Sequence, residues 1–133
     1  MRSTRRFTPT SQWEDARQRR GLWGERVAMA FLTSCGWQIE GHRFRLGHHD
    51  VDVVARRGTL VAFVEVKARG SVLCGTPVES VRWQKRRSLS KVAALWQVRH
   101  GRPNDEYRFD VIAIQFRAGG GYSVEHLEDA WRL

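Results

Sequence analysis

Three charged residues, Asp52, Glu65 and Lys67, interrupt two stretches of sequence that otherwise favour buried β-strands. The stretches are rich in Val and Phe, and a turn signal at Gly58-Thr59 separates them. If those two residues form a two-residue turn, Asp52 lies directly opposite Glu65, with Cβ atoms about 5 Å apart. Two carboxylates that close repel each other unless a cation or a proton lies between them. The pattern therefore predicts a site for a hard divalent metal, with Lys67 at its edge to contact an anionic substrate.

A simpler interpretation stays open, because strand charges often face water and then need no function. The register of the hairpin decides between the two. A three-residue loop would move Asp52 and Glu65 to opposite faces of the sheet. With strict alternation of side chains, Asp50 shares the face of Asp52, and Lys67 shares the face of Glu65.

A further carboxylate is expected to point inward from the first helix. Glu25 precedes Ala28 and Leu32 on the apolar stripe of that helix. An inward carboxylate is costly unless it is paired, hydrogen-bonded or bound to a metal. Gly24 beside it would allow a close approach of the backbone to the sheet. The alternative to a metal ligand is an ion pair with Arg26 or another nearby arginine.

The second helix carries an inward lysine and a basic surface. Lys85 lies on the stripe between Val81 and Leu89, where it could contact a bound phosphate or extend out to solvent. Basic residues on the flanking faces predict a surface that follows a phosphate backbone, unless they only face solvent: Arg82, Arg86, Arg87 and Lys91. Trp83 beside them is a candidate for stacking on a base.

The overall charge favours a polyanionic partner. The 133 residues include 23 Lys and Arg against 14 Asp and Glu, which gives a net charge of +9 and a pI of about 10.9. Nucleic acid is the first candidate and an anionic membrane surface the second. No stretch reaches the length of a transmembrane helix, and no apolar run follows the basic N-terminus. We therefore expect a cytoplasmic protein without a membrane partner.

The two cysteines, Cys35 and Cys74, have neither zinc-site nor redox-motif spacing. Cys35 extends the apolar stripe of the first helix and is predicted to be a small core residue. The two histidines that precede the acidic strand, His48 and His49, lack a ligand spacing and are interpreted as residues of a surface loop.

The periodicity predicts an α/β domain with the element order αβββαββ. Residues 1–11 form a flexible basic arm, and residues 12–133 form a single domain with no internal linker. Helices are expected over about 12–35 and 78–99, and strands over 37–45, 50–56, 60–67, 107–116 and 122–126.

Several of these segments together resemble the YraN-like family of endonuclease-like bacterial proteins. The similarity rests on segments distributed over most of the chain: Gly24-Glu25-Arg26-Val27-Ala28, Asp50-Val51-Asp52-Val53-Val54-Ala55, Phe63-Val64-Glu65-Val66-Lys67-Ala68-Arg69, Gly75-Thr76-Pro77, Lys85 and Arg108-Phe109-Asp110-Val111. The family is placed in the PD-(D/E)xK, or restriction-endonuclease-like, superfamily. The resemblance thus implies a mixed central sheet flanked by helices and a single nuclease-like domain.

The same resemblance implies roles for individual residues. Asp52, Glu65 and Lys67 match the catalytic motif, and Asp52 and Glu65, with Glu25, would bind Mg²⁺ or Mn²⁺. Lys85 matches a basic position on the later helix. The family usually has Gly-Glu-Ile-Asp where this chain has His49-Asp50-Val51-Asp52, so its acidic side chain at Asp50 is one methylene shorter.

The expected function is metal-dependent hydrolysis of phosphodiester bonds in DNA, including branched or recombination intermediates. One alternative is a module of the same fold that binds nucleic acid without cutting it. Another is an RNA- or ribosome-associated protein that uses charge alone, for which Asp52 and Glu65 would be dispensable.

Overall fold

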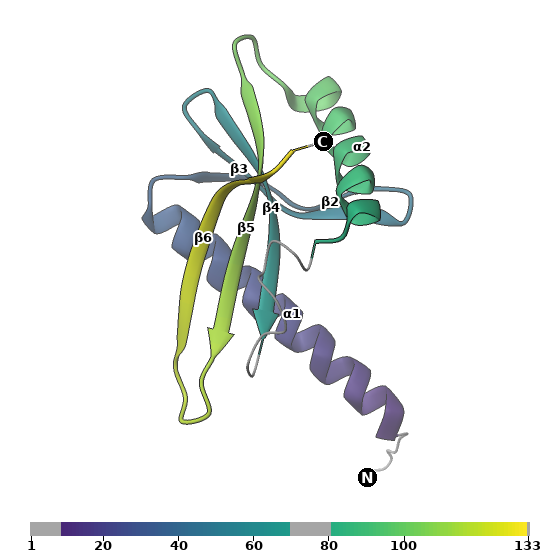
Figure 1. Ribbon diagram of the computed structural model, residues 1–133, viewed down its shortest axis with the longest axis vertical. Coiled ribbons are helices and arrows are strands. Elements are labelled where there is room, and N and C mark those ends of the chain that lie inside the picture. The colour runs from purple at the N-terminus through teal and green to yellow at the C-terminus, as the bar shows by residue number, and fades with distance from the viewer. Residues whose placement is uncertain (1–8, 70–80, 133) are drawn as a thin grey trace.

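The computed structural model describes residues 9–69 and 81–132, with the side chains of the first helix described from Gly21 onward. The elements follow the order αβββαββ (Figure 1): α1 (Pro9–Ser34), β2 (Gln38–Leu46), β3 (His49–Arg57), β4 (Leu60–Arg69), α2 (Trp83–His100), β5 (Glu106–Phe116) and β6 (Tyr122–Trp131). The order expected from the sequence is confirmed. The Gly75-Thr76-Pro77 segment and residues 1–8 of the expected arm lie outside the described residues.

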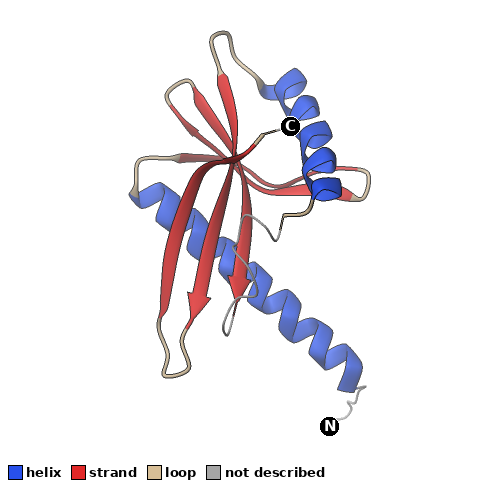
Figure 2. Cartoon of the chain, viewed as in Figure 1, coloured by secondary structure: helices blue, strands red, loops and turns tan. Residues whose placement is uncertain are grey.

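The five strands form one mixed sheet in the order β2-β3-β4-β5-β6 (Figure 2). β4 and β5 pair in parallel, and the other neighbouring strands pair antiparallel. The parallel pair requires a crossover connection, and α2 supplies it. This mixed sheet with its flanking helices confirms the predicted fold class.

The two helices bury different faces of the sheet, so the domain has two apolar layers. On one face α1 contributes Ala28 and Leu32 to a cluster with the sheet residues Trp37, Val53, Ala55, Ala62, Val64, Ile112 and Ile114. On the other face α2 contributes Leu89, Val92, Ala93 and Trp96 to a cluster with Val51, Val54, Val61, Phe63, Val111 and Trp131. The apolar stripes of both helices therefore pack as their spacing predicts.

The ends of both helices and of the last strand depart from the expectation. The second helix begins at Trp83, after the expected start at about residue 78, and Val81 and Arg82 lie outside it. The first helix begins at Pro9, before the expected start at residue 12, and it ends at Ser34. Cys35 follows in a turn and is exposed, so its assignment to the core was wrong. The helix ends one residue before Cys35, so this side chain does not continue the apolar stripe into the core. The last strand continues to Trp131 because it pairs with β5 over nearly its whole length.

The Arg56 side chain anchors the β3–β4 hairpin, near its turn, to the neighbouring elements. It is 4 % exposed and donates two hydrogen bonds to Asp105, at 2.6 and 2.9 Å, and a third to Glu40 at 3.0 Å. These contacts, followed by burial acting in the opposite direction, leave the pKa of the Arg56 guanidinium above its ordinary value. Such a charge is stable inside a protein only when its donors are paired, so this network ties β2, β3 and the loop before β5 together.

α1 lies unusually close to β4 because residue 24 has no side chain. A Cβ placed on Gly24 would be 2.9 Å from the Cβ of Ala68, which is attached directly to the β4 backbone and cannot move aside. The same Cβ would lie 3.9 Å from Val66 and Ile114, at ordinary contact distance. Gly24 therefore sets the distance between the sheet and the next residue of the helix, Glu25.

Gly24→Ala should lower the free energy of unfolding by about 1–3 kcal/mol, because the helix must move away from β4. Gly21→Ala is the matched control in the same helix, since a Cβ there meets no atom within 4 Å. It should raise the stability by up to about 1 kcal/mol through the helix preference of alanine. Urea unfolding of both variants tests this, and a Gly24→Ala variant as stable as Gly21→Ala would contradict the close approach.

Candidate active site

The hairpin register brings two acidic residues together at its open end. Gly58 and Thr59 form a two-residue turn, since Arg57 pairs with Leu60, and the ladder continues to the pair Val53 and Val64. The next residues outward on the two strands are Asp52 and Glu65. Here the Asp52 carboxylate, through Oδ2, accepts a hydrogen bond of 2.8 Å from the Val66 backbone N–H. The ladder is thus extended by a side chain, and the carboxyl group is held against β4.

Asp52 also lies where the side chains of β3 stop alternating regularly between the two faces of the sheet. Val51 packs in the cluster beneath α2, whereas Val53 packs in the cluster beneath α1. Opposite them on β2, Arg43 has a positive φ of 57°, a conformation that costs energy for a residue with a side chain. Strict alternation of side chains therefore does not hold between Val51 and Val53. Asp50 lies 3.6 Å from Arg45 in an ion pair.

Burial and mutual repulsion favour a proton on this acidic pair. The pKa of Glu65 is raised to about 8, mainly by burial and then by the negative charge of Asp52 and a hydrogen bond with its carboxyl group. The positive charges of Lys85 and Lys67 act in the opposite direction. Burial likewise raises the pKa of Asp52, offset in part by hydrogen bonds from Glu65 and the Val66 N–H. Glu65 is 5 % exposed, and its buried Oε2 atom has no hydrogen-bond donor among residues 9–69 and 81–132. The pair thus has an unfilled position for a proton or a cation.

Two lysines supply positive charge beside the pair. Lys67 follows Glu65 on β4 at the same-face spacing and lowers the cost of its charge. Lys85 of α2 places its Nζ 3.6 Å from Glu65 Oε1, and its side chain is 44 % exposed. Lys85 therefore points toward the sheet, as its place on the apolar stripe indicates, and it still reaches solvent.

Glu25 is buried next to the pair but is committed to other partners. Its Oε1 accepts from Arg43 Nε at 2.9 Å and contacts His42 Nε2 at 2.6 Å, and its Oε2 accepts from Arg43 at 3.1 Å. Burial alone would raise the pKa of Glu25, but the hydrogen bonds from Arg43 and His42 hold it below its ordinary value. The structure thus realises the ion-pair alternative, with Arg43 of β2 as the partner. As a metal ligand, Glu25 would have to leave these contacts.

The basic residues of α2 fall into two groups. Arg82, Arg87 and Lys91 are exposed. Arg86 is half-buried, donates a 2.8 Å hydrogen bond to the Val81 carbonyl and lies 5.6 Å from the ring centre of Trp131. Arg86 therefore stabilises the start of α2 and its packing against Trp131. His48 and His49 are both exposed. Only His48 lies in the turn; His49 is the first residue of β3 and pairs with Leu46, so its assignment to a loop was wrong.

The residues that sequence reasoning missed are His42 and Arg43. Both belong to β2, which the sequence marks only as a strand, and no local pattern connects them to Glu25. A basic residue with an unfavourable backbone conformation is the signal in the structure. That signal cannot be read from the amino-acid order.

A second polar cluster lies on the α1 side of the sheet. Asp110 is fully buried and receives two hydrogen bonds from Arg108, one from the Asp129 N–H and a 2.7 Å contact from His126. Burial alone would raise the pKa of Asp110, and these contacts hold it lowered. All its acceptor positions are used, so this cluster ties β5 to β6 and offers no opening to a ligand.

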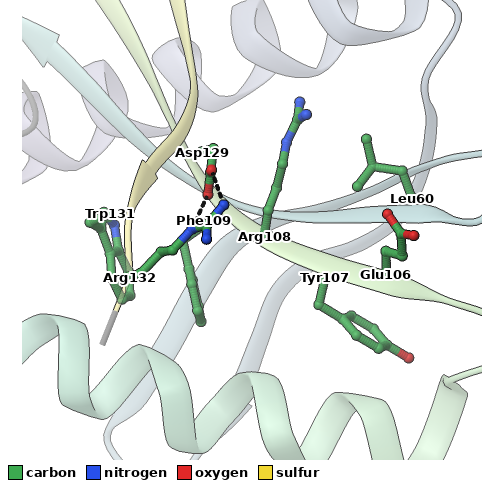
Figure 3. Close-up of a pocket in the computed structure, with 8 residues that line it drawn as sticks. All are labelled: Leu60, Glu106, Tyr107, Arg108, Phe109, Asp129, Trp131 and Arg132. Atoms are coloured by element: carbon green, nitrogen blue, oxygen red, sulfur yellow. Dashed lines mark hydrogen bonds and ion pairs between the residues drawn. The ribbon is translucent and has the colours of Figure 1, made fainter.

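A cavity of about 630 Å³ lies away from the acidic pair. Figure 3 shows it between the starts of β4 and β5, at Leu60 and Glu106, and the end of β6 at Trp131. Its charged residues include Arg132 and Asp129, which pair with each other at 2.6 Å. Arg108 in its lining is also paired, with Asp110 and Glu128.

Comparison with known proteins identifies the class of the chain. A family model described as "Uncharacterised protein family UPF0102" matches residues 24–114, which include Glu25, Asp52, Glu65, Lys67 and Lys85. The chain belongs to this family, and the resemblance to the YraN-like family is confirmed.

Curated relatives support this assignment. A UPF0102 protein of Nocardia farcinica is 34% identical over 112 residues, covering 84% of this chain and 88% of the relative. Another from Rhodococcus jostii is 36% identical over 111 residues, covering 84% and 94%. One from Pelobacter propionicus is 36% identical over 131 residues, covering 97% and 94%. The names of these relatives give the family to which they belong and state no activity.

No helix in the described part of the chain is long and apolar enough to cross a membrane.

The raised pKa of Glu65 predicts a pH dependence of stability in metal-free buffer. The ordinary pKa of a Glu carboxyl is 4.5, and the folded protein raises that of Glu65 to about 8. The folded state therefore binds the proton more tightly than the unfolded state. This stabilisation is fully present below pH 4.5 and is lost as the pH rises through about 8. Glu65→Gln removes this loss, so its stability relative to wild type should increase with pH across that window. Urea unfolding in a chelator measures it. The exposed Glu125→Gln variant should follow wild type at each pH, and parallel curves for Glu65→Gln and wild type would contradict the burial of the pair.

Proposed function

We propose that the protein is a metal-dependent nuclease that hydrolyses phosphodiester bonds in DNA, including branched or recombination intermediates. The observation that carries the proposal is the pairing of the half-buried Asp52 with the buried Glu65, with Lys67 and Lys85 beside them. Among the described residues, no hydrogen-bond donor contacts Glu65 Oε2. Perturbed pKa values of this kind gather at functional sites. Membership of the UPF0102 family is compatible with the proposal and does not by itself assign an activity.

The residues fit a small divalent cation. Mg²⁺ is usually held by one or two carboxylates together with waters and substrate phosphates, so two carboxylates suffice. Asp52 Oδ2 accepts from the Val66 N–H, so Asp52 Oδ1 and Glu65 Oε2 are the oxygens that would bind the cation. Mg²⁺ or Mn²⁺ bound there would polarise the phosphate and lower the pKa of a bound water.

The side chains of the chain itself would orient the reacting groups. Glu65 and Asp52 repel a phosphate unless their charge is neutralised, so they admit the substrate only together with a cation. Lys67 can orient or help deprotonate the attacking water and stabilise the charged transition state. Lys85, half exposed, can exchange its contact with Glu65 for a phosphate oxygen.

One observation favours the second candidate, a module that binds nucleic acid without cutting it. Among residues 21–69 and 81–132, no three side chains of His, Cys, Asp or Glu come together as potential metal ligands. Glu25, the expected third ligand, is held by Arg43 and His42. A binding module needs no such triad. Cleavage and metal affinity separate the two candidates.

Asp52→Asn and Glu65→Gln should abolish cleavage while leaving DNA binding unchanged or tighter, because each removes a negative charge that holds metal and repels phosphate. Lys67→Ala should reduce the cleavage rate by about 10²–10³-fold and leave metal affinity similar or higher. The assays are cleavage of single-stranded, duplex and branched DNA with Mg²⁺ and Mn²⁺, filter binding, and metal titration by calorimetry.

Glu125→Gln is the matched control, since Glu125 is exposed on β6 and should behave as wild type in all three assays. Cleavage that survives both carboxylate changes would place the chemistry elsewhere. Tight binding by a wild-type protein that cuts no substrate would favour the binding module.

Duplex binding should weaken steeply with salt, with a log–log slope of about −0.9 per neutralised phosphate. Replacing Arg82, Arg87 and Lys91 by Ala should flatten that slope, because these three side chains are exposed on α2. Arg86 is left in place because its contacts with Val81 and Trp131 are structural. An unchanged slope in the triple variant would move the duplex-binding surface away from α2.

A further inference from the structure

α2 begins with an aromatic side chain that the fold leaves in solvent. Trp83 is 59 % exposed, although tryptophan usually buries most of its large surface. The Arg87 guanidinium lies 4.8 Å from its ring centre, one helical turn further on. One face of the indole is thus covered by a cation, and the exposure leaves the rest of the ring open to a partner.

The surroundings of Trp83 suit a nucleic acid better than a protein. Lys91 continues the four-residue spacing of Trp83 and Arg87 along the helix, and α2 contains no Asp or Glu from end to end. A protein partner requires a contiguous apolar patch. The other large exposed apolar residue of this helix, Val98, lies fifteen positions away, or about 22 Å along the axis. An isolated indole among cations is the combination used to bind single strands.

Trp83 and the acidic pair lie at the same end of α2. Lys85, which contacts Glu65, follows Trp83 by two residues, or about 3 Å along the axis. Two residues turn a helix by about 200°, so Lys85 faces the sheet while Trp83 faces away from it. Arg82, the residue that precedes α2, is exposed and makes no side-chain cap, so its guanidinium adds positive charge at this end of the helix. A strand that bends over this end of α2 can touch all of these groups.

We infer that the N-terminal end of α2 binds an unpaired DNA segment, with one base stacked on Trp83 and the adjoining phosphates along Arg87 and Lys91. The inference rests on the proposed function and specifies its substrate class: DNA with a single-stranded segment next to the cleaved bond. In a continuous duplex every base is already stacked on its neighbours, so the indole gains a partner only where the strands separate. Trp83 thus discriminates between DNA structures and takes no part in the chemistry.

The experiment compares single-stranded and duplex oligonucleotides of one sequence, by fluorescence anisotropy in a chelator so that nothing is cut. Trp83→Ala should weaken single-strand binding by about 5- to 150-fold and change duplex binding by less than about twofold. Trp83→Phe, which keeps an aromatic ring, should recover most of the loss. Val98→Ala, exposed at the far end of the helix, is the matched control and should bind as wild type.

A single-stranded oligonucleotide containing 2-aminopurine gives a direct readout of stacking. Its emission should fall on binding to wild type and to Trp83→Phe, and should stay unchanged with Trp83→Ala at saturating protein. Equal losses of single-strand and duplex binding, or none, would overturn the inference and would leave a protein contact as the use of Trp83. Since no metal is present, these results are independent of whether the protein cleaves DNA.

Discussion

The repulsion between two carboxylates that water can only partly reach is the main electrostatic constraint on this site. Asp52 and Glu65 are held side by side between the strands of a hairpin, where neither can be fully hydrated. The folded state must then supply a proton, a lysine or a cation. Lys85 of α2 and Lys67 of β4 lie beside the pair, yet no donor in the described part of the chain contacts Glu65 Oε2. The compensation by the protein itself is therefore incomplete.

The other contacts near the pair fix its position. Gly24 lets α1 approach β4 closely, which buries the neighbouring Glu25 against β2. Glu25 in turn holds Arg43, the residue at which β2 takes its positive φ. Opposite that point β3 loses its alternation and turns Asp52 toward β4. The close approach of α1, the Glu25–Arg43 ion pair and the irregular backbone of β2 thus together fix the position of the Asp52 carboxyl group.

The hairpin and the order of elements could be predicted because their signals are local. A Gly-Thr turn between β-branched stretches sets the register, and the register decides that Asp52 approaches Glu65. The partner of Glu25 could not be predicted, because Arg43 lies on another element and the contact depends on how the helix crosses the sheet. Cys35 was misplaced for a related reason: periodicity gives the buried side of a helix but not the residue where the helix ends.

The distribution of charge gives this site its distinct character. With a net charge of +9, the chain offers a cationic partner to almost any acid, and Glu25, Glu40, Asp105 and Asp110 each have one at hydrogen-bond distance. Asp52 and Glu65 instead face each other, and the nearest ammonium group, that of Lys85, stays 3.6 Å from Glu65. An arginine in place of Lys85 could neutralise the pair more fully with its planar fork. The arrangement found here keeps the carboxylates short of positive charge, and that shortage is what a divalent cation would satisfy.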